Sequence, residues 1–475
     1  MEFFISFFFI SFLKIDIIKL NYLGDIRMAI KLRELTIEQI KNVDHGNIKF
    51  YDSKGYINLL GIYGQNGSGK TTIVDAMDIL KTIMEGKSIP EDSFGIFNTS
   101  EERLPKICIE IESENNLLLR YEVRFISNES TVEQNVYLAH ETISYKELKP
   151  KTQFKRLFEF TILERDASGE LVGSLKSRSK FISKDAIEVL AEAAFRAKSS
   201  VLFSQEFKNR VEKQEGKKIE KKAYHIFEEL CNHIRIYTQR YANLTGMGAM
   251  PININYKNEN HAFQGGLPAI LNRGGTPIPK ELLTVYEDTI HYMNEIIPVI
   301  IPDLTLKMTV GESTIDSQEN QYYNVNFLAQ RNGKTFSLIH ESEGIRKIIS
   351  MIGFLIEVFN KPGIIAFIDE IDSGIFEYLL GELMEIFSND ASGQLIFTSH
   401  NLRILEMLPT RKIRFSTTNR ENRYITLKGV KTTNNLRDLY LRSIQIGGAD
   451  EELYKGQSQS KIRRALRKAG KYIGE

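Results

Sequence analysis

Alternating apolar and polar residues mark four segments in the first half of the chain, residues 106–112, 117–126, 134–145 and 157–164. Alternation with a period of two is typical of half-buried antiparallel strands. Residues 364–368 instead form a continuous apolar run, as expected for a strand that is buried on both faces. The pattern predicts an α/β protein in which an antiparallel β subdomain accompanies a buried sheet.

The middle of the chain follows a different pattern. Between about residues 180 and 240 the apolar residues recur at helical spacing, and no heptad pattern persists for more than a few turns. We therefore expect a compact helical region and not a coiled coil. Residues 246–279 are rich in Gly, Asn and Pro, which predicts a loop. A helix over 281–297 and strands over 304–310 and 322–328 are expected to follow.

A phosphate-binding loop follows the apolar strand predicted at residues 57–63. The loop consists of Gly64, Gln65, Asn66, Gly67, Ser68, Gly69, Lys70, Thr71 and Thr72, and apolar residues at helical spacing come after it. The glycines allow several backbone N–H groups to point at phosphates, which the helix N-terminus also favours. Lys70 is expected to reach the β- and γ-phosphates, and Thr71 to bind Mg²⁺. The sequence thus predicts a nucleoside triphosphate site.

Two carboxylates, Asp369 and Glu370, directly follow the apolar strand at residues 364–368. The carboxyl end of such a strand is where an open α/β sheet binds its ligands. We expect Asp369 to hold Mg²⁺ through water and Glu370 to orient or deprotonate the attacking water. Together with the phosphate-binding loop, this pair predicts an ATP hydrolase that uses Mg²⁺.

Three further motifs lie around the acidic strand. Asp372 follows it in an Ile-Asp-Ser-Gly segment, a second apolar strand at residues 394–399 ends at His400, and residues 339–347 lead into the apolar helix 348–359. In their order along the chain, these motifs resemble the head of an ABC-type ATPase. They would be its P-loop, its signature, its Walker B strand with a following glutamate, its D-loop and its switch histidine.

Within that superfamily the sequence resembles the RecF and SMC proteins more than membrane transporters. Residues 35–43 and 46–50 resemble the opening strands of RecF and SMC heads. The Glu-Ser-Glu-Gly signature at residues 341–344 is similar to the AAA ATPases of OLD-like proteins and of bacterial anti-phage systems such as Septu, PARIS and abortive-infection loci. The resemblance covers residues 28–80 and 336–448.

This resemblance implies roles for the residues that match its motifs. Ser342, Glu343 and Gly344 would face the γ-phosphate bound by a second protomer, so that two ATP molecules are enclosed in a head-to-tail homodimer. His400 would contact the γ-phosphate of its own chain, and Asp372 would cross the dimer interface. A Q-loop glutamine is also expected, and three candidates remain open: Gln134, Gln153 and Gln205.

The motifs and the change in pattern divide the chain into five parts. The apolar run in residues 1–27 is too short to span a bilayer and lacks signal-peptide features, so we expect a mis-annotated leader before a true start at Met28. The remaining parts are an ABC ATPase lobe I with the P-loop (28–149), an inserted mixed helical and strand domain (150–335), an ABC ATPase lobe II (336–448) and a basic C-terminal tail (449–475).

Charge and cysteine usage add little to this division. The formal net charge of +1 gives no global reason to expect nucleic acid, and the two cysteines form no C-x-x-C pair, so a reducing cytoplasm is the simplest location. Residues 208–222 are basic but interleaved with acids, as in a solvated helix. Residues 461–471 are basic and carry no acidic residue. They would bind nucleic acid or an acidic partner, or they would simply form a solvated tail helix.

The function expected from the resemblance is that of a sensor or regulator in bacterial anti-phage defence. OLD-type proteins carry a metal-dependent nuclease after the ATPase, and the sequence shows no second acidic cluster with such spacing. The effector, a nuclease or a toxin, is therefore expected to be a separate protein, and no membrane association is expected. The alternatives are a RecF-like DNA-binding ATPase of DNA repair and an antitoxin-like ATPase that sequesters a toxin.

Overall fold

The computed structural model describes residues 30–470 except for several short segments, so the expected leader at residues 1–27 lies outside the described residues. The other segments that lie outside the described residues are 99–102, 114–115, 129–134, 166–170, 178–183, 214–217, 239–247, 258–261, 272–274, 316–320, 428–434, 447–450 and 457.

A mostly parallel sheet of six strands forms the centre of the molecule. Its spatial order is β11 (Ile234–Tyr237), β18 (Ile365–Ile368), β19 (Gln394–Thr398), β5 (Leu59–Tyr63), β20 (Ile413–Ser416) and β21 (Tyr424–Ile425). The first five strands run parallel, and β21 pairs antiparallel with β20. The strands predicted before the P-loop and before Asp369 are confirmed, and β19 lies between them. The carboxyl ends of β5, β19 and β18 therefore meet at one edge.

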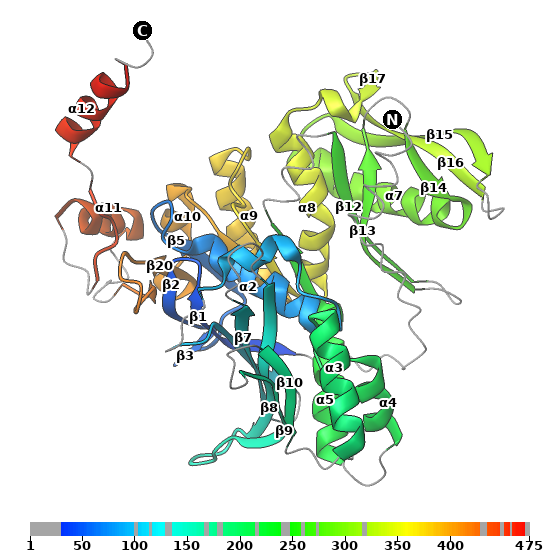
Figure 1. Ribbon diagram of the computed structural model, residues 1–475. Coiled ribbons are helices and arrows are strands. Elements are labelled where there is room, and N and C mark those ends of the chain that lie inside the picture. Colours follow the sequence, from blue (N-terminus) through cyan, green and yellow to red (C-terminus); the bar gives the residue numbers. More distant parts are fainter. Residues whose placement is uncertain are drawn as a thin grey trace.

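Helices cover both faces of this sheet (Figure 1). Alternate residues of β18 face opposite sides: Ile365 and Phe367 join a core with α2 (Lys70–Met84) and α5 (Lys218–His233). Ala366 and Ile368 join a second core on the other face. The helices of that second core are α8 (Glu343–Asn360), α9 (Glu377–Asp390), α10 (Leu402–Met407) and α11 (Leu436–Ile446).

An antiparallel sheet of seven strands packs against α2 from the side opposite to the central sheet. Its order is β10 (Leu171–Ser177), β9 (Lys155–Arg165), β8 (Asn135–Glu147), β7 (Leu117–Asn128), β6 (Lys106–Ser113), β1 (Lys31–Ile40) and β2 (Val43–Lys49). The four alternating segments are thus confirmed as antiparallel strands, and the sheet shares the core of α2.

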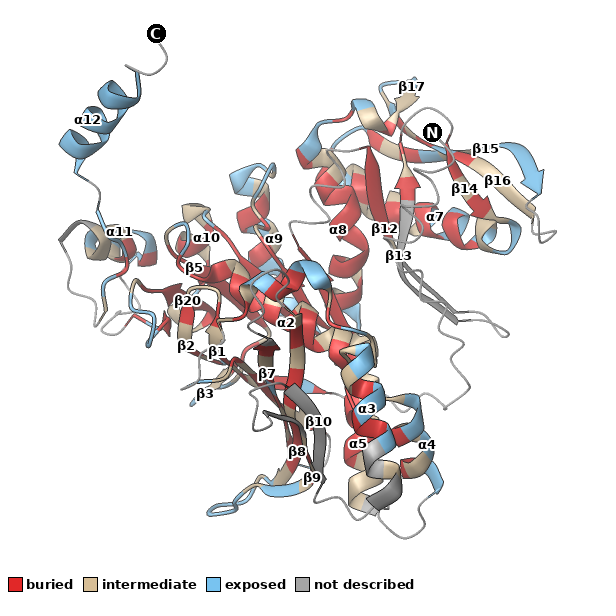
Figure 2. Cartoon of the chain, viewed as in Figure 1, coloured by how far each residue is buried: buried red, intermediate tan, exposed pale blue. Residues whose placement is uncertain are grey.

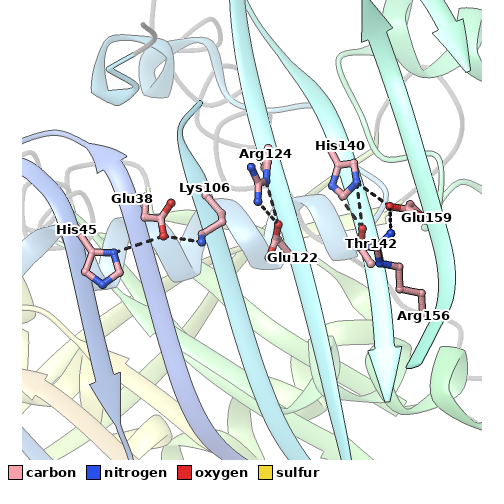
Figure 3. A network of polar contacts seen from close by, with 9 residues as sticks. All are labelled: Glu38, His45, Lys106, Glu122, Arg124, His140, Thr142, Arg156 and Glu159. Atoms are coloured by element: carbon pink, nitrogen blue, oxygen red, sulfur yellow. Dashed lines mark hydrogen bonds and ion pairs between the residues drawn. The ribbon is translucent and has the colours of Figure 1, made fainter. Parts of the chain in front are cut away.

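The outer face of the antiparallel sheet carries charges of both signs (Figure 3). Glu38 on β1 lies 2.5 Å from Lys106 on β6, and Glu159 on β9 lies 2.8 Å from Arg156. Glu122 and Arg124 form a further pair along β7. These pairs are partly exposed, and ion pairs at a solvated surface add little to the free energy of folding, so this face is best explained as a charge-balanced solvated surface.

Residues 150–335 do not form one insert in the structure. Strands β9 and β10 extend the antiparallel sheet, and α3 (Lys184–Ala197) and α4 (Gln205–Lys213) pack with α5 into the same core. The strand β11 then enters the central sheet beside β18, where a helical pattern extending to about residue 240 was expected. Periodicity cannot separate a buried strand of four residues from the end of a helix, which explains the difference.

A separate α/β unit follows and packs on α8 (Figure 1). It consists of β12 (Ala249–Lys257), β13 (Ala262–Ile270), β14 (Thr276–Pro279), α7 (Leu283–Ile300), β15 (Leu304–Ile315), β16 (Gln321–Arg331) and β17 (Lys334–Ser337). The expected helix α7 and strands β15 and β16 are confirmed. The loop expected at 246–279 is wrong, because β12 and β13 pair with each other throughout, and Asn253 on β12 donates a hydrogen bond to Ser350 of α8.

The last described helix, α12 (Gln459–Gly470), projects from the body and is exposed at every residue (Figure 2). Short elements complete the described chain: β3 (Tyr51–Asp52), β4 (Gly55–Tyr56), η1 (Glu91–Ile96), η2 (Lys280–Leu282), η3 (Leu338–His340) and η4 (Thr410–Lys412). Cys108 and Cys231 are buried free thiols. Among the described helices, none has the length and apolar character needed to cross a membrane.

Candidate nucleotide site

The phosphate-binding loop connects β5 to α2, as the sequence predicted. Its backbone requires glycine at two places for different reasons. Gly69 has a φ of +90°, in the left-handed region that favours glycine, and a Cβ on Gly64 would lie 1.9 Å from the Ser416 hydroxyl. The Tyr424 hydroxyl donates a hydrogen bond of 2.7 Å to the Gly69 carbonyl oxygen. The β20–β21 hairpin therefore holds the loop in shape from behind.

Lys70 is folded into the loop that it belongs to. Its Nζ donates hydrogen bonds of 3.0 Å to the carbonyl oxygens of Gly64 and Gln65. Burial lowers the pKa of the Lys70 ammonium, and the carboxylates of Asp369 and Glu370 oppose that shift. The ammonium thus lies at the centre of the loop, in position to meet the phosphates of a nucleotide.

Asp369 and Thr71 fit the protein side of a Mg²⁺ site. Thr71 Oγ1 and Thr398 Oγ1 donate to the same oxygen, Asp369 Oδ1, at 3.2 and 2.6 Å. The other carboxylate oxygen, Oδ2, is buried and has no hydrogen-bond partner among the described residues. Burial raises the pKa of Asp369, and both hydroxyl donors oppose that rise. Mg²⁺ favours one or two protein oxygens completed by water and phosphate, which matches this hydroxyl and buried carboxylate.

A pocket of roughly 360 Å³ opens beside these groups and collects residues from four motifs. Its walls are formed by Asn66, Glu370, Asp372, Ser373 and His400. The His400 backbone N–H donates a 3.1 Å hydrogen bond to Asp372 Oδ2. Partial burial and the nearby Lys70 lower the pKa of the His400 imidazole, which favours its neutral form near pH 7. The P-loop, the acidic strand, the D-loop and the switch histidine therefore meet at one site.

The signature residues lie at the start of α8. Ser342 is the exposed N-cap of this helix, and its Oγ accepts a 3.3 Å hydrogen bond from the Ile345 N–H. Glu343 is exposed, whereas Gly344 is buried: a Cβ on it would lie 2.0 Å from the carbonyl oxygen of Gly374 in the D-loop. The signature and the D-loop of one chain are thus in backbone contact. A role of these residues toward a second protomer stays a prediction.

Sequence reasoning missed several residues of this site. Lys347 is 4% exposed, and its Nζ donates a hydrogen bond to the carbonyl oxygen of Glu370. A lysine within the apolar spacing of α8 was the one signal that could have revealed it. Tyr424, Ser416 and Thr398 gave no such signal, because each acts on a motif far away in the sequence.

The other sequence candidates lie away from the pocket or outside the described residues. Gln134 lies outside the described residues, and Gln153 is exposed. Gln205 donates a hydrogen bond to Asn209 on the same helix, α4. None of the described candidates lines the pocket, and the identity of the Q-loop residue stays open.

The fold is that of an ABC-type P-loop ATPase head, an α/β core with an antiparallel β subdomain and a P-loop at the edge of its parallel sheet. In agreement, residues 34–258, somewhat less than half of the chain, match the AAA_23 family, described as an AAA domain. No curated protein matches the chain.

Solved structures of SMC heads are similar to the chain at low identity. The Smc head bound to the C-winged helix domain of ScpA is 14% identical, with 84% of this chain and 98% of that chain covered and a TM-score of 0.37. The SMC head domain from Thermotoga maritima is 15% identical, with 84% and 99% covered and a TM-score of 0.32. The Smc head bound to the C-terminal domain of ScpA from Pyrococcus furiosus is 14% identical, with 84% of this chain and 96% of that chain covered and a TM-score of 0.34. Likeness at this level does not extend to function.

Proposed function

We propose that the protein binds ATP with Mg²⁺ at this site and hydrolyses it. The observation that supports this most directly is the pocket where Glu370 and His400 lie beside the P-loop. Lys70 would contact the β- and γ-phosphates, and Thr71 and Asp369 would hold the ion, which supplies charge neutralisation for the phosphates. Glu370 would orient and deprotonate the attacking water, while His400 would contact the γ-phosphate.

A second copy of the chain would complete the site. Ser342 lies exposed at the N-terminus of α8, where the backbone N–H groups of a first turn and the helix dipole favour a phosphate. A head-to-tail homodimer, alone or within a higher oligomer, would bring this N-terminus to the ATP of the other copy. Asp372, which lines the pocket beside the P-loop, would lie at the interface.

The proposed role of the ATPase is to report its nucleotide state to a separate effector in bacterial anti-phage defence. This role rests on the resemblance of the signature to defence ATPases. The α/β unit of residues 249–337 packs on α8, so a movement of the signature helix would also move the surface that this unit presents. The purified chain alone is then expected to cleave neither DNA nor RNA, and any toxicity in cells should require a partner gene.

One observation favours the second candidate, a RecF-like ATPase that binds DNA. The helix α12 is exposed throughout and carries five cations and no acid between Lys461 and Lys468. The outer face of the antiparallel sheet argues in the other direction, because its charges are balanced (Figure 3). Binding to duplex DNA that weakens steeply with salt and is lost without α12 would favour the DNA-binding role.

The decisive experiment for the proposed chemistry is a steady-state ATPase assay of the purified protein with Mg²⁺ and with excess chelator. Hydrolysis is expected only with the ion, and Lys70→Ala should abolish it. Light scattering of the Glu370→Gln variant should detect a dimer with ATP and not with ADP. A wild-type protein without ATPase activity would disprove the proposed function.

A further inference from the structure

The backbone of the proposed catalytic base is in an unusual conformation. Glu370 has a φ of +48°, in the left-handed region that costs a residue with a side chain roughly 1 kcal/mol or more. Such a conformation persists when its surroundings fix it. The peptide groups of Glu370 are held on both sides: its N–H donates 2.7 Å to Thr398 Oγ1, and its carbonyl oxygen accepts 3.0 Å from the Ser373 N–H.

The second donor to that carbonyl oxygen comes from the signature helix. Lys347, one turn beyond Gly344 on α8, reaches the Glu370 carbonyl oxygen with its Nζ. Burial lowers the pKa of the Lys347 ammonium, and the nearby carboxylates of Asp372, Glu370 and Asp369 oppose that shift. This charge among carboxylates explains why a lysine occupies a buried position in an otherwise apolar helix face.

A backbone contact joins the same two segments a few residues away. Gly344 and Gly374 approach so closely that a Cβ on Gly374 would lie 2.5 Å from the Gly344 Cα. The first turn of α8 therefore cannot shift without moving the D-loop or breaking the hydrogen bond of Lys347. The exposed N-cap Ser342 lies at the start of that turn.

We propose that Lys347 is a positioning residue that couples the signature segment to the catalytic base of the same chain. The inference rests on the proposed ATPase function and goes beyond it. A phosphate bound at Ser342 would fix the position of the first turn of α8. The hydrogen bond from Lys347 would then fix the Glu370 backbone, and with it the Glu370 carboxylate in the pocket. Because the phosphate at Ser342 belongs to the other copy of the dimer, hydrolysis at one site then depends on ATP at the other.

The test compares two buried lysines. Lys347→Met removes the hydrogen bond and the charge, whereas Lys412→Met makes the same change at a site remote from the pocket, where Nζ donates 3.0 Å to Asn58 and 2.7 Å to Ser388. We expect Lys347→Met to lower kcat at least ~10-fold and to change the Kd for ATP less than ~3-fold, because it disturbs the base and not the phosphate contacts. Lys347→Arg should restore much of kcat, since a guanidinium still donates.

The control Lys412→Met should lower the melting temperature and leave kcat near the wild-type value. Because the two sites are coupled, the wild-type rate should depend on ATP concentration sigmoidally, and Lys347→Met should lose this sigmoidal form. Should that variant fail to fold, Lys347→Gln, whose side chain is one bond shorter, takes its place with the same expected loss of kcat.

Three outcomes would overturn the inference. An active wild-type protein with an unchanged kcat in Lys347→Met, or in Lys347→Gln where that variant is used, would overturn the coupling alone. Parallel losses of kcat and ATP affinity would assign Lys347 to nucleotide binding and would also overturn it. A wild-type protein that does not hydrolyse ATP would overturn the proposed function and the coupling with it.

Discussion

The two ends of the proposed site differ in how the chain supports them. The P-loop is held by its own lysine, by the hydroxyls of Ser416 and Tyr424 behind it, and by the closely packed Gly64. The signature instead begins at an exposed serine whose side chain caps its own helix. The comparison indicates that one chain preorganises the phosphate-binding half, whereas the signature half presents an exposed helix start that the proposed homodimer would use.

The largest effect is expected at the phosphate-binding half. Glu370→Gln keeps the residues that would hold ATP and Mg²⁺ but removes the base, so kcat should fall about 10²-fold or more while ATP still binds. Rapid-quench assays and equilibrium binding measure the two quantities separately. Hydrolysis at the wild-type rate would show that Glu370 is not the general base.

The next prediction tests whether the signature half works only between two chains. Lys70→Ala and Ser342→Arg should each be inactive alone, because every site then carries one lesion. In an equal mixture half of the dimers are mixed and have one intact site of two, so about a quarter of the wild-type activity should return if the two sites work independently, and roughly tenfold less if hydrolysis needs ATP at the second site. A mixture that stays inactive although mixed dimers form would contradict the shared site, and full activity of Ser342→Arg alone would exclude a role for the signature.

A third prediction concerns the metal at the preorganised half. Asp369→Asn keeps the shape of the side chain but removes the charge that Mg²⁺ requires, so hydrolysis should be lost and Mg²⁺ should no longer strengthen ATP binding. Titration of ATP with and without the ion measures this. If Mg²⁺ strengthened binding in the variant as in the wild-type protein, Asp369 would not be its ligand.

The smallest effects are expected when a single buried tyrosine hydroxyl is removed, either behind the P-loop or beside the signature helix. Tyr424→Phe leaves the buried Gly69 carbonyl oxygen without its hydroxyl donor, at a cost of about 1–3 kcal/mol, and should weaken ATP binding several-fold. The matched variant Tyr237→Phe removes the same group below α8, where Tyr237 OH pairs with Ser350 Oγ at 2.9 Å. It should lower the melting temperature with little change in ATP affinity. Equal losses of ATP affinity in the two variants would show that the Tyr424 hydroxyl has no particular role in stabilising the P-loop.

The sequence by itself determined the strands and loops that local chemistry encodes. The P-loop with Lys70 and Thr71, the acidic pair Asp369 and Glu370, and His400 after its strand all lie at one sheet edge, because parallel strands present their carboxyl ends together. The alternating segments became the antiparallel sheet for a similar reason, since a period of two is a property of the strand itself.

Only the tertiary structure decided which distant segments support these motifs. Tyr424 reaches Gly69 across 355 positions, and β11 joins β18 from a segment that reads as the end of a helix. The paired strands at 249–270 likewise lie in a Gly-rich and Asn-rich sequence that predicts a loop. Such contacts depend on the order of strands in a sheet and on the packing of α8, and that order follows from the burial of whole surfaces, which no short sequence pattern records.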